Sequence, residues 1–205
     1  MKTVLAVWIV LLLSVTSAQA SRGEMARELL LETNVARSDP ARYVGYLKEM
    51  RGYFIGKGYR VPGSFNLVMT KEGVAAVDEA IAFLSRQRPI SALSWSPGLA
   101  RAAAELVREQ AGSGATGHEG TSGDLKQRIE RFGAWQGSIA ENIGYGPDTA
   151  RRMVLELIVD DGVSDRGHRK NIFEPSFGTA GVACGPHPMY RNMCVMDFAV
   201  GYKSK

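Results

Sequence analysis

Apolar residues recur every three or four positions over much of the chain, which is the period of an amphipathic helix. In two places Asp or Ser precedes Pro at the start of such a pattern. The polar side chain can cap the helix there, and Pro suits the first helical position because it needs no N–H. The pattern predicts helices over 24–37, from Asp39-Pro40 through Met50, over 71–86, from Ser96-Pro97 onward, over 124–132 and from about Asp148 onward.

Alternation of apolar and polar residues replaces the helical period near the C-terminus. Residues 179–184 and 193–202 each place apolar side chains at every second position, which predicts a β-hairpin, and 138–143 is a further short strand. Runs of helices followed by strands indicate an α+β fold. Residues 51–70 are rich in Gly and aromatic side chains, and we expect an irregular excursion there.

The first twenty residues have the pattern of a signal peptide. Lys2 precedes an apolar run over 4–13, and Ser17-Ala18-Gln19-Ala20 is the small-residue pattern of a cleavage site. We expect cleavage after Ala20 and a secreted or periplasmic protein. No later apolar run is long enough for a transmembrane helix. Residues 21–205 are then expected to form a single domain.

The charge pattern argues against nucleic acid as a partner. The chain carries 25 basic and 21 acidic side chains, for a net charge of +4, and loss of Lys2 with the signal peptide reduces this to +3. The basic residues are scattered among acidic ones rather than collected into a stripe, which is typical of a solvated surface.

The two cysteines, Cys184 and Cys194, lie on the two strands of the predicted hairpin. In an exported protein such a pair favours a disulfide. Because the closed loop is short, we expect a contribution of only about 2–3 kcal/mol. A thiolate nucleophile or metal ligand is the alternative interpretation.

Three polar blocks in the C-terminal half carry the candidate chemistry and contain two of the three histidines. They are Gly117-His118-Glu119, Ala140-Glu141-Asn142-Ile143 and Arg166-Gly167-His168-Arg169-Lys170-Asn171-Ile172. Imidazoles beside a carboxylate can bind metal or move protons. Each residue also has a structural interpretation: His118 in a hydrogen-bonded loop, Glu141 in a turn and His168 at a helix cap.

A glycine-rich stretch before the first block matches the dinucleotide-binding fingerprint by its letters. Residues 112–117 follow a predicted helix rather than a strand, and no βαβ pattern surrounds them. We interpret them as a flexible loop leading to His118.

Several motifs in order make residues 91–202 resemble the CAP domain (cysteine-rich secretory proteins, antigen 5 and pathogenesis-related 1), especially its bacterial secreted branch. They are the three polar blocks, Leu93-Ser94-Trp95-Ser96 before them, Gly181-Val182-Ala183-Cys184 after them, and Asn34-Val35-Ala36-Arg37 near the start. The resemblance implies an α-β-α sandwich. It is best over 91–205, whereas 21–90 comprises the N-terminal helices and the excursion.

The resemblance also implies a central cavity lined by two His and two acidic residues. His118, Glu141 and His168 match three of these positions. The fourth is Glu in animal and plant members, and spacing offers Asp160 here. Asp160-Asp161-Gly162 also has the pattern of a helix C-terminus with a Gly stop.

Two functions fit such a cavity. His118, His168 and Glu141 could bind zinc or another divalent metal, and a metal-dependent hydrolase of peptide or ester bonds would follow. The preferred hypothesis is a binding module for an envelope component, a lipid or a protein. Aromatic residues in Tyr53–Phe65 could form the contact surface, with core packing as the alternative.

Overall fold

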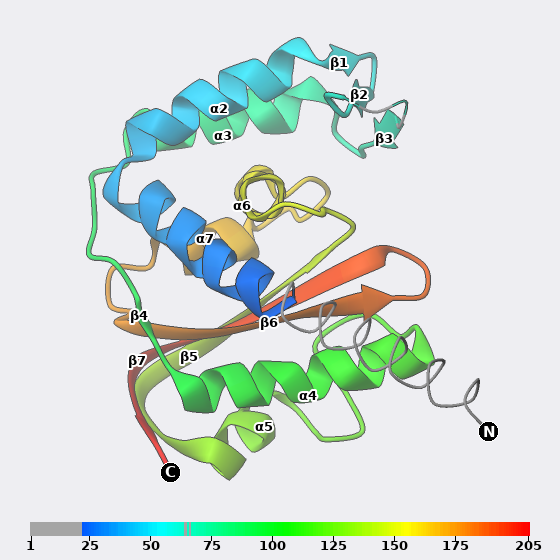
Figure 1. Ribbon diagram of the computed structural model, residues 1–205. Coiled ribbons are helices and arrows are strands. Elements are labelled where there is room, and N and C mark those ends of the chain that lie inside the picture. The colour runs from blue at the N-terminus through cyan, green and yellow to red at the C-terminus, as the bar shows by residue number, and fades with distance from the viewer. Residues whose placement is uncertain (1–21, 64, 66) are drawn as a thin grey trace, which may run out of the picture.

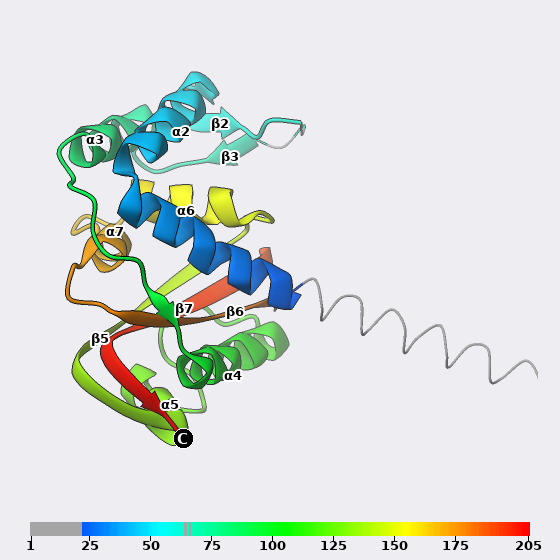
Figure 2. The ribbon, with the colours of Figure 1, turned by 60° about the vertical axis from the view of Figure 1, so that its left-hand side comes forward.

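The computed structural model describes residues 22–205, except residues 64 and 66. The predicted signal peptide lies outside the described residues. A four-stranded sheet forms the centre of the molecule. Helices 22–38, α6 and α7 cover one face, with α2 and α3 stacked beyond them, and α4 and α5 cover the other face (Figures 1 and 2). The predicted α+β fold and α-β-α sandwich are confirmed.

The helices follow the predicted pattern closely. Helix 22–38 is followed by α2 (Pro40–Gly52), α3 (Val74–Leu84), α4 (Pro97–Ser113), α5 (Leu125–Phe132), α6 (Ala150–Val159) and α7 (Gly167–Phe173). The predicted caps are present: the Asp39 side chain accepts a hydrogen bond from the Arg42 amide, and that of Ser96 from the Leu99 amide. The short helix α7 agrees with the structural interpretation of His168 at a helix start, although the helix begins at Gly167 and its N-cap is Arg166.

The central sheet has the order β4-β6-β7-β5. Its strands are β4 (Ser94–Trp95), β5 (Gly133–Tyr145), β6 (Thr179–His187) and β7 (Arg191–Ser204). β4 runs parallel to β6, whereas β6–β7 and β7–β5 are antiparallel. The predicted hairpin is β6–β7, with Cys184 directly opposite Cys194, and their sulfur atoms form the predicted disulfide. β5 is longer than its prediction of 138–143 because it pairs with β7 along most of its length.

Both faces of the sheet are buried. Residues of helix 22–38, α2, α3, α6 and α7 form the larger core with one face, whereas α4 and α5 pack two smaller clusters against the other. Gly181 on β6 permits the close approach of α4, because a Cβ atom at this position would overlap the backbone of Leu99 and Ala100. The site described below lies where these helices meet β5.

The prediction of an irregular excursion over 51–70 was wrong in one respect. This segment contains a small antiparallel sheet of β1 (Phe54–Ile55), β2 (Gly58–Arg60) and β3 (Leu67–Met69). Positive φ at Gly56 permits the tight β1–β2 turn. α3 begins at Val74 rather than at 71, because Asp161 accepts hydrogen bonds from the amides of residues 71 and 72. Over the described part of the chain, no helix is both long and apolar enough to cross a membrane.

Candidate functional site

The four predicted cavity residues form two separate pairs. His118 Nδ1 lies 2.8 Å from Glu141 Oε1, and His168 Nδ1 lies 2.6 Å from Asp160 Oδ1. Both carboxylates are buried, whereas the His118 side chain is 54% exposed and that of His168 is 23% exposed. Each histidine is therefore oriented by a carboxylate within the protein and keeps part of its ring open.

Arg128 on α5 organises the first pair. Its guanidinium is fully buried and donates hydrogen bonds to Glu141 Oε2, to the His118 carbonyl at 2.9 Å and to the Gly123 carbonyl at 2.8 Å. The hydrogen bond to Glu141 raises the pKa of His118, although burial and the charge of Arg128 oppose this shift. Arg128 thus holds both the carboxylate and the loop that carries the imidazole.

Asp197 adds a second buried carboxyl group to this side of the sheet. It lies directly opposite Glu141 in the β5–β7 register and is fully buried, and within residues 22–205, apart from 64 and 66, neither carboxyl oxygen has a hydrogen-bond donor other than a shared proton with Glu141. Burial and then the charge of Glu141 raise its pKa well above the usual value, whereas Arg128 acts in the opposite direction. Burial therefore favours the neutral form of the Asp197 carboxyl group.

The second pair joins α6 to α7. Asp160 ends α6 in the left-handed conformation, as the predicted helix C-terminus requires. Its Oδ2 accepts hydrogen bonds from the His168 amide at 2.9 Å and the Arg169 amide at 3.3 Å, while Oδ1 contacts the His168 ring. The predicted helix C-terminus at Asp160 is confirmed, and the same side chain contacts the His168 imidazole and accepts hydrogen bonds from amides at the start of α7.

Consecutive residues of β5 connect the two pairs. The Glu141 side chain contacts His118 and Arg128, whereas the next residue, Asn142, donates to the His168 carbonyl at 3.0 Å. Adjacent side chains on a strand point to opposite faces. The two pairs are consequently attached to opposite sides of β5, which is an edge strand of the central sheet.

The predicted metal-ligand set of His118, Glu141 and His168 does not fit this arrangement. Within 22–205, apart from the two undescribed positions, no three His, Cys, Asp or Glu side chains are placed to hold a metal ion. Glu141 uses both oxygens for His118 and Arg128, and the buried guanidinium would repel a cation bound there. We therefore derive no chemistry through a metal from these residues.

Sequence reasoning missed Arg128 and Asp197. Arg128 lies three residues after Leu125 and four before Phe132, so a charged side chain interrupts the apolar face of α5. Asp197 is the one acidic residue in the apolar run 193–200. An isolated charge in a buried stripe was a usable signal, because such a group needs a partner or a shifted pKa.

His187, the third histidine, has a structural role. It is buried at the end of β6, where its Nε2 donates to the Ala115 carbonyl at 3.0 Å. Its ring packs edge-to-face on Tyr145, with the ring centres 5.3 Å apart. This histidine fixes the loop before His118 against the sheet.

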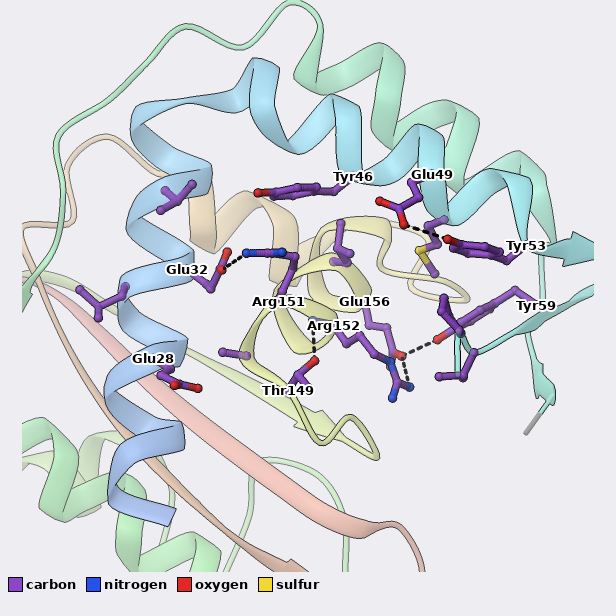
Figure 3. A pocket seen from close by; sticks show the side chains of 17 residues that line it. Glu28, Glu32, Tyr46, Glu49, Tyr53, Tyr59, Thr149, Arg151, Arg152 and Glu156 are labelled. Carbon is purple, nitrogen blue, oxygen red and sulfur yellow. Dashed lines mark hydrogen bonds and ion pairs between the residues drawn. The ribbon is translucent and has the colours of Figure 1, made fainter. Parts of the chain in front are cut away.

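A larger cavity lies on the other side of α6. It has a volume of about 640 Å³ and is enclosed by helix 22–38, α2, α6 and the segment after β2 (Figure 3). Its apolar wall comprises Leu31, Val35, Met50, Val61, Pro62, Ala150 and Leu155, and its aromatic wall comprises Tyr46, Tyr53 and Tyr59. The predicted cavity residues are not among its lining side chains.

Charged side chains around this cavity are mostly paired with each other. Arg151 contacts Glu32 at 2.9 Å, and Tyr59 donates to Glu156 at 2.6 Å (Figure 3). Burial raises the pKa of Glu156, against the opposing effect of Tyr59. Four glutamates but only two arginines line the cavity, so its walls carry an excess of acidic groups.

A smaller cavity of about 260 Å³ lies beside the second pair. His168 and Asp160 line it together with Phe54 and Val68 from the small sheet. Met69, the last residue of β3, also borders this cavity, although most of its side chain is exposed on the outer face of the small sheet. The excursion over 51–70 therefore covers His168. His118 and Glu141 are not among the lining residues of this cavity.

Fold and sequence together define the class of protein. A four-stranded sheet lies between two helical layers, and the ordered polar blocks meet at its edge. The family profile described as CAP, cysteine-rich secretory protein family, matches residues 32–198. The chain belongs to the CAP family. A search of curated protein sequences finds no match.

Solved structures similar to this chain include bacterial proteins at low identity. An extracellular protein containing an SCP domain from Bacillus anthracis is 19% identical, with a TM-score of 0.44, and the match covers 62% of this chain and 38% of that one. An outer surface protein from Borrelia burgdorferi is 16% identical, with a TM-score of 0.46 and coverage of 57% and 80%. A cysteine-rich secretory protein from Staphylococcus aureus is 14% identical, with a TM-score of 0.38 and coverage of 62% and 37%. The chain thus spans less than half of the first and third structures.

Proposed function

We propose that this protein is an exported binding module and that the cavity in Figure 3 is its ligand site. The observation that carries the proposal is a cavity of about 640 Å³ whose apolar and aromatic walls are interrupted by a few oriented polar groups. Small-molecule sites commonly have this size and composition. Export is supported by the signal-peptide pattern of residues 1–20. The names of an extracellular and an outer surface protein among the similar structures agree with it.

The charges around the cavity favour a ligand with an apolar body and a cationic head. Arg151 and Arg152 are each engaged by carboxylates, at 2.9 Å to Glu32 and 3.0 Å to Asp148. The charge of each arginine is therefore already balanced by a carboxylate. Glu28 lines the same cavity, and its carboxylate makes no hydrogen bond or ion pair within the described structure. The tyrosine rings can also contact a cation through their faces.

A matched pair of ligands tests this proposal. Calorimetric titration of the folded protein with decylammonium and with decanoate, each below its micelle concentration, compares opposite head charges on the same chain. We expect decylammonium to bind at least about tenfold more tightly, a difference of about 1.4 kcal/mol. Val35→Trp, which fills the cavity from helix 22–38, should abolish binding. Val44→Trp is the control because Val44 packs against the core without lining the cavity.

Equal binding of the two amphiphiles would contradict the cationic preference. Binding that survives Val35→Trp would contradict the choice of cavity. Retention of the thermal unfolding midpoint in both tryptophan variants is required for either conclusion, and it separates loss of the site from loss of the fold.

The alternative function is the metal-dependent hydrolase. One feature favours it. A carboxylate contacts Nδ1 of both His118 and His168, and metal-bound histidines commonly donate their other ring nitrogen to a carboxylate in this way. Zinc titration of the wild type and of a His118→Ala/His168→Ala variant tests it. We expect no tight zinc binding, because the carboxylates are engaged elsewhere. Micromolar binding that disappears in the variant would contradict this expectation and justify assays of peptide and ester hydrolysis.

A further inference from the structure

Exposed apolar side chains gather on the small sheet outside the CAP core. Seven large apolar residues are exposed among the described residues, and four of them lie within 55–69. They are Ile55, Phe65, Leu67 and Met69 in this segment, and Leu31, Met189 and Tyr190 elsewhere. Single exposed apolar residues are ordinary, whereas a cluster indicates a contact surface.

Strand pairing places these residues on one face of the small sheet. Ile55 and Met69 both lie opposite Gly58, and Leu67 lies opposite Arg60. Because Gly58 has no side chain, Leu67 and Met69 lie over it: a Cβ atom there would come within 3.0 Å of Met69 Sδ and 3.1 Å of Leu67 Cδ1. We call this outer face, together with Phe65, the apolar patch.

The opposite face of the same sheet is already in use. Tyr59 is buried and donates to Glu156, while Phe54 and Val68 pack against the main core. An antiparallel sheet with one buried face commonly has a polar outer face. In this small sheet the outer face is apolar instead. Core packing does not account for the patch. Phe65 is fully exposed, so the sequence-based hypothesis of a contact surface applies to it and not to Tyr59.

Positively charged side chains surround the apolar patch. Residues 50–71 contain Arg51, Lys57, Arg60 and Lys71 but no acidic residue, and all four cations are exposed. Arg51 is paired with Asp78 at 2.5 Å. The other three make no ion pair with a carboxylate within the described part of the chain. The carboxylate of Glu72, which follows directly, is paired with Arg166.

We propose that the apolar patch and its three unpaired cations dock the protein onto an anionic lipid surface. Apolar side chains flanked by lysine and arginine suit the boundary between acyl chains and headgroups, where cations meet anionic headgroups. The strands contain only two or three residues each. Such a face is small beside the roughly 800 Å² that each partner buries in a stable protein complex. A lipid surface needs no complementary partner shape, so a small patch is sufficient.

The patch also adjoins the cavity of Figure 3. Tyr53, Tyr59, Val61 and Pro62 of the same segment line that cavity. Docking through the outer face would therefore bring the cavity close to the lipid surface. The proposal does not depend on a ligand in the cavity, because it rests on the opposite face of the small sheet.

Vesicle sedimentation with the full mature chain tests the proposal. One set of vesicles is pure phosphatidylcholine, and the other contains about 30% phosphatidylglycerol as the anionic lipid. We expect binding to the anionic vesicles and at least about fivefold weaker binding to the neutral ones. Raising the ionic strength from about 0.1 M to about 1 M should reduce binding, because it shortens the Debye length from about 10 Å to about 3 Å.

Variants distinguish binding through the apolar patch from nonspecific binding by other exposed apolar residues. Leu67→Ser/Met69→Ser should reduce the affinity for anionic vesicles at least about tenfold, because it removes two side chains that insert among the lipids. Lys57→Gln should reduce it about fivefold, the effect of one cation near an anionic surface. Met189→Ser is the matched control, since Met189 is 71% exposed and Met69 is 68% exposed.

Three results would overturn the proposal. The first is absence of binding to anionic vesicles by the folded wild type. The second is an equal loss of binding in the Met189→Ser control. The third is self-association in light scattering that Leu67→Ser/Met69→Ser abolishes, since the patch would then bind a second copy. None of these three results changes the expected outcome of the decylammonium titration. The docking proposal and the proposed ligand cavity can therefore fail separately.

Discussion

Replacement of Arg128 by Met tests the interpretation of the first histidine pair most directly. Methionine keeps much of the length and apolar volume of arginine, but it removes the charge and every hydrogen-bond donor. The change leaves Glu141 buried without its cation, next to the buried Asp197. It also removes the hydrogen bonds that Arg128 donates to the carbonyl groups of His118, at 2.9 Å, and Gly123, at 2.8 Å. Breaking a buried ion pair from one side costs about 3–5 kcal/mol.

The matched control lies one turn further along α5. Arg131→Met makes the same chemical change, but the side chains of Arg131 and its partner Glu105 are 43% and 17% exposed, against 0% and 2% for Arg128 and Glu141. Exposed pairs contribute about 0–1 kcal/mol. We expect urea unfolding to show a loss of about 3–5 kcal/mol for Arg128→Met and no more than about 1 kcal/mol for Arg131→Met.

A second measurement follows His118 itself. The charge of Arg128 lowers the pKa of this histidine, while Glu141 raises it. Removing Arg128 should therefore raise the His118 pKa further, as an NMR titration of the imidazole protons would show. Equal losses of stability in the two methionine variants, together with an unchanged His118 pKa, would refute the role assigned to Arg128.

The remaining predictions concern a second titrating group, the disulfide and two glycines. Burial raises the folded-state pKa of Asp197 above its usual value, so the contribution of this group to stability should fall as the pH rises from about 4 toward the folded-state pKa. The free energy of unfolding of Asp197→Asn in urea, relative to that of the wild type, should therefore increase between about pH 4 and pH 7.5. A difference between the two proteins that does not change with pH would contradict this prediction. Cys184→Ser/Cys194→Ser, which opens a loop with a sequence separation of 10, should lower the free energy of unfolding by about 2–3 kcal/mol. An unchanged urea midpoint would contradict this estimate. Gly181→Ala should lower the thermal midpoint by overlap with α4, at a cost of about 1–3 kcal/mol or more. Gly45→Ala in α2, with nothing near its Cβ position, should stabilise by about 0.5–1 kcal/mol, and equal effects at both glycines would contradict the packing argument.

The local sequence was sufficient to predict the helices and the C-terminal hairpin. Helix starts depend on a few neighbouring residues, and Asp39 and Ser96 cap their helices as predicted. The disulfide could be predicted for the same reason, because alternation in two adjacent strands places Cys184 opposite Cys194. The apolar periods also fixed which face of helix 22–38 is buried, including Leu29 and Ala36.

The small sheet within 51–70 was beyond local reasoning. Its strands contain only two or three residues, which is too short for an alternating pattern to be recognised. Pairing between them, and the packing of Tyr59 against α6, determines which face is buried. The exposed position of Leu67 and Met69 followed only from that register.

The sequence by itself determined which residues carry the candidate chemistry, because His118, Glu141, Asp160 and His168 could be named from their order along the chain. Only the tertiary structure decided how they pair. Partners such as His118 and Glu141 are 23 residues apart, and a strand edge brings them together. The charge state of the site also depends on Arg128, which a separate helix buries beside it. Burial and Coulomb interactions act over distances in space and not along the chain, and therefore only the folded structure sets them.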